Sequence, residues 1–313
     1  MNSIHLHARL AELFFSLYVI FMKILDGGLG RELARRGAPF RQPEWSALAL
    51  IEAPETVKEV HLDFINAGAE VITTNNYAVV PFHIGQERFE TDGVRLIKVA
   101  IEQAKNAVKE SSKNVKIAGC LPPLFGSYRA DLFQPEQAKN LAEPIINTLA
   151  PEVDFWLAET QSCLKEVETV HALLPQDGKD YWVSFTLQDE IKQEQALLRS
   201  GENMQQVADF IKQSNAKAVL FNCCQPEVIL QAINEIKVLI PVSVQIGAYA
   251  NAFPPQDESA TANDGLDEIR KDLDAPAYLG FAKQWQQAGA SLVGGCCGIG
   301  PEHISELSQF FKE

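Results

Sequence analysis

The chain has 313 residues, of which 46% are hydrophobic and 22% charged. This length and composition suit a soluble protein of one large or two modest domains with a sizeable core. Its formal net charge of −14 opposes contact with phosphate backbones and anionic lipid, so we expect neither nucleic acid nor membrane as a partner. The 6 cysteines include two adjacent pairs, which are a poor basis for disulfides and indicate metal or redox chemistry in a cytoplasmic protein.

The N-terminus reads as an extension to a single domain, with residues 1–22 outside the core and residues 23–313 forming the domain. Residues 13–22 are an apolar run preceded by Arg9, too short to cross a bilayer comfortably and followed by no small-residue cleavage site. The first predicted strand begins immediately afterwards, so cleavage or membrane insertion there would crowd it. We therefore expect an added segment, with Met22 as an alternative initiator.

From residue 23 onward, short apolar runs rich in β-branched residues alternate with longer amphipathic stretches. The short runs are continuously apolar, as expected of parallel strands that are buried on both faces. The predicted strands are 24–27, 71–75, 115–120, 155–160, 182–187, 219–223, 242–247 and 291–295.

The amphipathic stretches between these runs predict helices. The first begins at Pro54 and ends before Gly68, which are common start and stop residues. A polar, acidic stretch at 252–274 is expected to be a long excursion after the seventh strand, as a lid or an oligomer contact. The predicted helices are 54–67, 90–111, 201–214, 277–289 and a last one that opens at Pro301.

Eight strand–helix units indicate an α/β fold, and we predict a single-domain (β/α)8 TIM barrel. A doubly wound open sheet uses the same alternation, and periodicity alone does not separate the two. Unusual polar residues favour the barrel, because they occur at or just past the ends of strands one, two, four, six and eight. Convergence of these ends on one point is natural in a closed barrel and much harder in an open sheet. These residues are Asp26, Thr74, Glu159, Cys223, Cys296 and Cys297.

Two cysteine pairs carry the strongest chemical signal: FNCC at 221–224 and GGCCG at 294–298. Thiolates suit zinc, and three sulfurs from distant strand ends would leave a fourth position open for a substrate. A vicinal redox pair and plain burial are the alternatives, and burial is our interpretation of the isolated Cys120 and Cys163. A phosphate-binding loop around the second pair is disfavoured, because no lysine or arginine lies near it.

Acidic residues end two of the predicted apolar strands. DGG at 26–28 places Asp26 where it can accept hydrogen bonds from a substrate ammonium, while glycine N–H groups hold a carboxylate; a tight turn is the alternative. LAET at 157–160 places Glu159 at a strand end, where a carboxylate is rarely left without a partner. We therefore predict a second ammonium acceptor there.

These motifs resemble the homocysteine S-methyltransferase family, which includes S-methylmethionine-using enzymes, betaine–homocysteine methyltransferase and the homocysteine half of cobalamin-dependent methionine synthase. The resemblance runs from about residue 23 to the C-terminus. It implies a (β/α)8 barrel in which Zn²⁺ is held by Cys223, Cys296 and Cys297, with Cys224 adjacent but not a ligand. The matching motifs are DGG at 26–28, ITTNNY at 72–77, LAET at 157–160, FNCC at 221–224 and GGCCG at 294–298.

The resemblance also implies how homocysteine is bound and what happens to it. Asp26, Gly27, Thr74 and Glu159 fall where the family binds the homocysteine backbone, with Thr73 as the neighbouring alternative to Thr74. The implied enzyme transfers a methyl group to the homocysteine thiol and forms methionine. Only a thiolate attacks a methyl group, and zinc binding removes the thiol proton. No protein side chain therefore has to act as the nucleophile.

The methyl donor is expected to be a sulfonium, S-methylmethionine or S-adenosylmethionine. The loop at 119–133 resembles the loop after strand three in the sulfonium-using branch, although it lacks that branch's YGA-type pattern. Aromatic faces stabilise such cations, and the candidates are Trp45, Tyr77, Phe125 and Tyr128. For each of them alone, packing is the favoured alternative. A betaine donor, a zinc- or thiol-binding protein without turnover, and a vicinal-cysteine redox enzyme are the alternatives. The expected partners are small molecules, and assembly into a homo-oligomer is an open alternative to a monomer.

Overall fold

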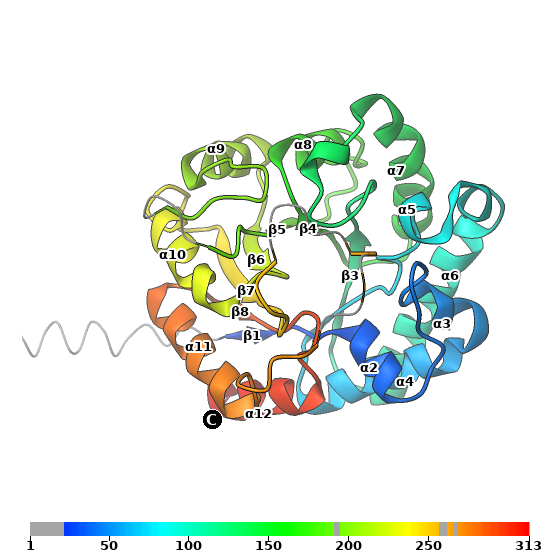
Figure 1. Cartoon of the computed structure of the whole chain (residues 1–313), viewed down its shortest axis with the longest axis horizontal. Helices are drawn as coiled ribbons and strands as arrows, with labels where there is room; N and C mark the ends of the chain where they lie inside the picture. The colour runs from blue at the N-terminus through cyan, green and yellow to red at the C-terminus, as the bar shows by residue number, and fades with distance from the viewer. Residues whose placement is uncertain (1–21, 191–194, 257–261, 264, 266–267, 313) are drawn as a thin grey trace, which may run out of the picture.

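The computed structural model describes residues 22–190, 195–256, 262–263, 265 and 268–312. Its strands form one parallel eight-stranded sheet in the order β1-β8-β7-β6-β5-β4-β3-β2. A parallel bridge between Leu25 and Val71 joins the two ends of this order, so the sheet closes into a barrel (Figure 1). The strands are β1 (Lys23–Ile24), β2 (Val71–Thr73), β3 (Lys116–Leu121), β4 (Phe155–Gln161), β5 (Tyr181–Phe185), β6 (Ala218–Asn222), β7 (Gln245–Tyr249) and β8 (Leu292–Val293).

Helices follow each strand and form the outer ring in Figure 1. The predicted (β/α)8 TIM barrel is therefore confirmed. The described helices are α2 (Leu29–Arg35), α3 (Ala47–Glu52), α4 (Pro54–Ala67), α5 (Pro81–Ile84), α6 (Gln86–Ser111), the 3-10 helix η1 (Ala130–Leu132), α7 (Pro135–Leu149), α8 (Leu164–His171), α9 (Met204–Ser214), α10 (Pro226–Ile236), α11 (Ala275–Ala288) and α12 (Pro301–Lys312).

Local chemistry explains where the predicted boundaries hold and where they fail. Helix α4 has the predicted bounds, and Gly68 ends it with a left-handed φ of 112°. The predicted strand at 242–247 is wrong by up to three residues, because a turn closed by the Val244 N–H and the Pro241 carbonyl precedes β7. Val242, an apolar residue read as strand, is fully exposed on that turn.

The barrel interior is apolar below the carboxyl ends of the strands. One hydrophobic cluster fills it, separate from the larger cluster between the strands and the helices. Because this packed layer fills the interior, polar side chains that follow the strands lie at the open end of the barrel. The interior cluster consists of Leu25, Val71, Ala118, Phe155, Leu157, Trp182, Ala218, Leu220, Tyr249 and Leu292.

Two sequence predictions fall partly outside the described residues. Of the predicted extension, residues 1–21 lie outside them, while Met22 is buried in the core; the division at residue 23 stays a prediction. The excursion predicted at 252–274 is described only in part. It connects β7 to α11. Among the described residues, no helix has the length and apolarity needed to cross a bilayer.

Candidate metal and substrate site

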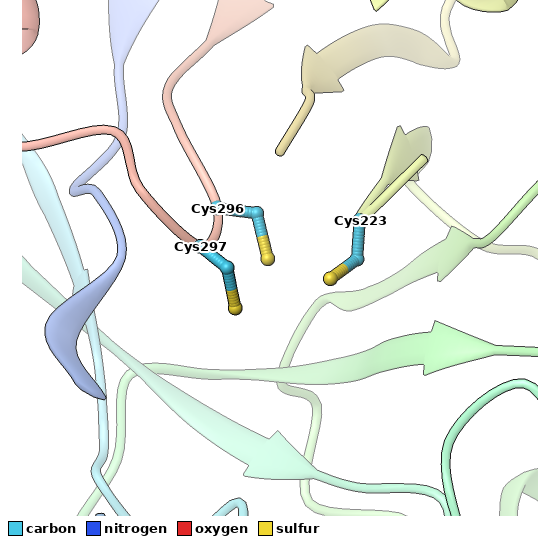
Figure 2. A group of neighbouring side chains, drawn as sticks. All are labelled: Cys223, Cys296 and Cys297. Carbon is cyan, nitrogen blue, oxygen red and sulfur yellow. The ribbon is translucent and has the colours of Figure 1, made fainter. Parts of the chain in front are cut away.

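Three cysteines from two strand ends converge at the carboxyl end of the barrel (Figure 2). Cys223 directly follows β6, and Cys296 and Cys297 follow β8. The three sulfur atoms all lie within 4.8 Å of one another. Ligands about 2.3 Å from a tetrahedral zinc lie about 3.8 Å apart, so the three thiols fit one metal ion. Within the described ranges, no other group of His, Cys, Asp or Glu residues has such a geometry.

The three thiols do not behave alike before a metal binds. Hydrogen bonds from Cys296 and Cys297 hold the pKa of Cys223 well below its ordinary value. The pKa values of Cys296 and Cys297 are raised in turn, first of all by their interactions with Cys223. Within the cluster, Cys223 is thus the hydrogen-bond acceptor, and Cys296 and Cys297 are its donors.

Backbone strain is concentrated around these cysteines. Cys223 has a left-handed φ of 52°, and so do Trp45, Tyr128 and Thr160, with φ values of 47°, 69° and 57°. All four line the same pocket. Such a backbone costs of order 1–3 kcal/mol at a non-glycine residue and persists where the surrounding structure enforces it. Here the strain accompanies the aiming of side chains into the pocket.

Glycines let the ends of β1 and β8 pack directly against each other. A Cβ on Gly28 would lie 2.4 Å from the carbonyl oxygen of Cys296, and one on Gly294 would lie 2.6 Å from Cβ of Leu25. Only glycine permits such a close approach. The DGG and GGCCG motifs are thus two halves of one contact, which holds Asp26 beside the cysteines.

All of the predicted site residues line one pocket of about 1140 Å³, a volume that includes its opening to solvent. The sequence prediction that these distant segments meet is confirmed. The predicted residues that line the pocket are Asp26, Gly27, Thr74, Glu159, Cys223, Cys296 and Cys297.

Two carboxylates face the pocket, that of the buried Asp26 and that of the half-buried Glu159. Asp26 accepts a hydrogen bond from the Thr73 N–H at 2.8 Å, and Glu159 accepts one from the Cys120 thiol at 3.5 Å. Burial raises the pKa of Asp26 well above its ordinary value, and the neighbouring Glu159 raises it further. Burial also raises the pKa of Glu159, to about 7. Neither acid has a salt-bridge partner in the part of the chain that the structure describes, so together they favour a bound cation such as an ammonium group.

Thr74 lines the pocket, but its hydroxyl is used within the protein. It donates to Oδ1 of Asn76 at 2.7 Å and accepts from the Cys120 N–H at 3.0 Å. The neighbouring Thr73 is less buried and also lines the pocket. Any contact of Thr74 with a substrate must therefore compete with these internal hydrogen bonds.

The aromatic candidates divide into three kinds. The candidates Trp45 and Tyr77 line the pocket. Phe125 is not among the lining residues and packs edge-to-face on Phe133 with ring centroids 5.5 Å apart, which is the packing role that the sequence favoured for it. Tyr128 lines the pocket, and its hydroxyl lies 3.0 Å from Sγ of Cys223, a contact that the sequence does not reveal.

Two asparagines near the sulfurs were missed by sequence reasoning. The amide nitrogen of Asn222 lies 4.0 Å from Sγ of Cys296, and that of Asn251 lies 3.9 Å from Sγ of Cys223. Asn222 is part of the FNCC motif, so its position beside the cysteines was a usable signal. Asn251 follows β7, for which the predicted bounds were wrong. The predicted burial of Cys120 and Cys163 is confirmed.

Convergent thiols and carboxylates without a salt-bridge partner, at the carboxyl ends of a (β/α)8 barrel, define a class of site: one that could hold a metal ion beside a cationic group. Within this class, the chain belongs to the homocysteine S-methyltransferase family, whose model matches residues 23–311. It is therefore a methyltransferase, and the predicted resemblance is confirmed.

Known proteins match over nearly the whole chain. Homocysteine S-methyltransferase 1 of Arabidopsis thaliana is 26% identical, over 92% of this chain and 93% of the relative. Homocysteine S-methyltransferase YbgG of Bacillus subtilis (strain 168) is 28% identical, over 92% and 94%. The crystal structure of the homocysteine methyltransferase MmuM from Escherichia coli in its metallated form has a TM-score of 0.75 and 28% identity, covering 93% of this chain and 96% of that one.

Proposed function

We propose that this protein is a zinc-dependent homocysteine S-methyltransferase that forms methionine from a sulfonium donor, S-methylmethionine or S-adenosylmethionine. The observation that carries the proposal is the presence of three convergent thiols and two unpaired carboxylates in one pocket. The names of the relatives and the metallated form of MmuM support it. Three thiolates favour zinc over metals that prefer oxygen ligands.

In this proposal, the side of the pocket formed by Asp26 and Glu159 binds the amino-acid part of homocysteine. Asp26 and Glu159 accept hydrogen bonds from its ammonium group. This group is the cationic partner that neither acid has within the described part of the protein. Gly27 contacts the substrate carboxylate. Gly28 is unsuited to this, because its N–H donates to the carbonyl of Ile299 at 2.9 Å. Thr74 is the remaining predicted contact.

When bound by Cys223, Cys296 and Cys297, Zn²⁺ would act as a Lewis acid that keeps the substrate sulfur in its thiolate form at neutral pH. The new bond forms between this sulfur and the methyl carbon. The donor's bond from methyl carbon to sulfur breaks, and its electron pair stays on the donor sulfur, which leaves as a neutral thioether. Trp45 and Tyr77 present aromatic faces to the positively charged donor.

A reducing compartment is part of the proposal. All of the cysteines are free thiols, and the three convergent ones bind a metal only when reduced. We therefore propose a cytoplasmic enzyme that acts on small molecules.

The test is a donor panel combined with metal analysis. The purified protein is incubated with homocysteine and S-methylmethionine, S-adenosylmethionine or betaine, and methionine and bound zinc are measured. We expect methionine with a sulfonium donor and one zinc per chain. Cys296→Ala should lose the zinc and at least about 100-fold of the activity, while Cys163→Ala, a buried cysteine outside the pocket, should keep both.

Each other outcome has a defined meaning. Zinc without methionine from any donor would identify a binding protein without turnover. A disulfide without metal would identify a redox protein, and turnover with betaine alone would overturn the sulfonium donor. A Cys296→Ala variant that keeps zinc and activity would refute the site assignment.

A further inference from the structure

Polar groups of the protein are unevenly distributed around the three sulfurs. The Tyr128 hydroxyl lies 3.0 Å from Sγ of Cys223, and the Asn251 amide lies 3.9 Å from the same atom. The Asn222 amide lies 4.0 Å from Sγ of Cys296. The Tyr128 contact is thus the shortest of the three, and it is made to the sulfur that has two such neighbours.

Tyr128 is held in this position by a constrained backbone and by the buried ion pair of Arg199 and Asp189. It lies in the loop after β3 with a left-handed φ of 69°, a conformation costing roughly 1–2 kcal/mol for a bulky residue. The Arg199 guanidinium lies over its ring, 4.9 Å from the centroid. Arg199 is in turn paired with Asp189 at 3.0 Å, and both side chains are almost completely buried.

The same region is also hydrogen-bonded to the segment that carries Cys223. The Asp189 carboxylate accepts the N–H of Gln225, two residues after Cys223, at 2.9 Å. The Thr186 hydroxyl donates to the carbonyl of Cys223 at 3.2 Å. The tyrosine ring and the cysteine therefore share one buried anchor, which fixes the distance between the hydroxyl and the sulfur.

We propose that Tyr128 is a positioning residue of the metal centre, whose hydroxyl donates a hydrogen bond to the Cys223 thiolate. The inference rests on the metal centre of the proposed function. A thiolate has no proton to give, so the hydroxyl is the donor once the cysteine is ionised. Such outer hydrogen bonds orient a ligand and withdraw charge from it. Three thiolates carry more negative charge than Zn²⁺ neutralises, and this hydrogen bond disperses part of the excess at Cys223.

The proposal differs from an aromatic role toward the methyl donor. An aromatic role would need the ring of Tyr128, whereas the positioning role needs its hydroxyl. Tyr128→Phe removes the hydroxyl, and keeps the ring and its contact with Arg199. It therefore separates the two roles.

The experiment uses the full chain loaded with Co²⁺ as a spectroscopic substitute for zinc. The thiolate-to-cobalt absorption band and the zinc affinity, by competition with a chelator, are measured for wild type and Tyr128→Phe. We expect the variant's band to move to longer wavelength, since a thiolate without its hydrogen bond gives up charge more easily. Zinc affinity should fall about 10–100-fold.

Two further variants keep the result interpretable. Tyr181→Phe removes a buried tyrosine hydroxyl at the start of β5 and should change neither measurement. Asn251→Ala removes the more distant donor to Cys223 and should move the band in the same direction by less.

An unchanged band and zinc affinity in Tyr128→Phe would overturn the positioning role, while methionine formation by wild type would leave the proposed function standing. A change in turnover alone would also overturn it and would assign Tyr128 to the donor site. If wild type shows no thiolate-to-cobalt band, the proposed metal centre and the inference both fail.

Discussion

The two sides of the pocket carry different chemical groups. The thiol side, formed by Cys223, Cys296 and Cys297, brings three like ligands within 4.8 Å of one another from two strand ends. The carboxylate side, formed by Asp26 and Glu159, holds two acids whose pKa values are raised. In the proposed function, the thiol side is complete once it holds a metal, and the carboxylate side gains its cation only from a bound amino acid. The two sides should therefore fail separately.

Removing the metal should have the largest effect and should act on the thiol side alone. Chelation is expected to lower methionine formation at least about 100-fold, and added Zn²⁺ should restore it. The metal-free protein should still bind methionine, because Asp26 and Glu159 remain to accept its ammonium group. Calorimetry with methionine measures this. Loss of methionine binding together with the metal would show that the two sides are one unit.

Changing the carboxylate side should have the next largest effect and leave the metal in place. Glu159→Gln keeps the shape of the side chain but removes its charge, and charged hydrogen bonds contribute about 1.5–3 kcal/mol. We expect the KM for homocysteine to rise about 10–150-fold at unchanged zinc content. The matched control is Glu166→Gln, which alters a buried carboxylate outside the pocket and should not affect KM. A loss of zinc in Glu159→Gln would break the separation between the sides.

The thiol side was predictable because its chemistry resides in the residue type. Four cysteines in two adjacent pairs at strand ends have few other uses, and a barrel brings strand ends together whatever the loops do. The outer contacts were not predictable in the same way. Tyr128 reaches Cys223 only through a loop with a left-handed φ, and no local pattern in the sequence encodes that reach.

The carboxylate side was predictable in position and less so in detail. Asp26 and Glu159 stand out because acids rarely end apolar strands unpaired. Thr74 and Thr73 are adjacent and chemically alike, so only the structure shows which hydroxyl is engaged. The same limit applies to the fold: alternation predicts eight strand–helix units, while the start of β7 depends on a turn at Pro241.

Lowering the pH should weaken the carboxylate side by a smaller and graded amount. Burial raises the pKa of Glu159 to about 7, so its charged form predominates only above that pH, and the raised pKa of Asp26 acts in the same direction. The Kd for methionine should therefore increase as the pH falls from about 8 to 6, by at most about tenfold per pH unit for each group. Methionine is the right probe, because it has no thiol proton to confuse the result.

Glu159→Gln provides the control for this pH dependence. It should bind methionine weakly, with the part of the pH dependence near pH 7 removed. A wild-type Kd that stays constant between pH 6 and 8 would contradict the role of Glu159 as an ammonium acceptor.

The smallest effect on binding is expected at Thr74, where stability should change more than affinity. Thr74→Val leaves Oδ1 of Asn76 and the N–H of Cys120 without their present partner, and an unpaired buried polar group costs about 1–3 kcal/mol. Thermal unfolding should show this loss, while the KM for homocysteine should rise less than in Glu159→Gln. Thr73→Val is the matched control and should change stability by only about 0.5 kcal/mol. A larger KM for Thr73→Val than for Thr74→Val would move the predicted substrate contact from Thr74 to Thr73. The Thr74 hydroxyl, which donates to Asn76, would then act only within the protein.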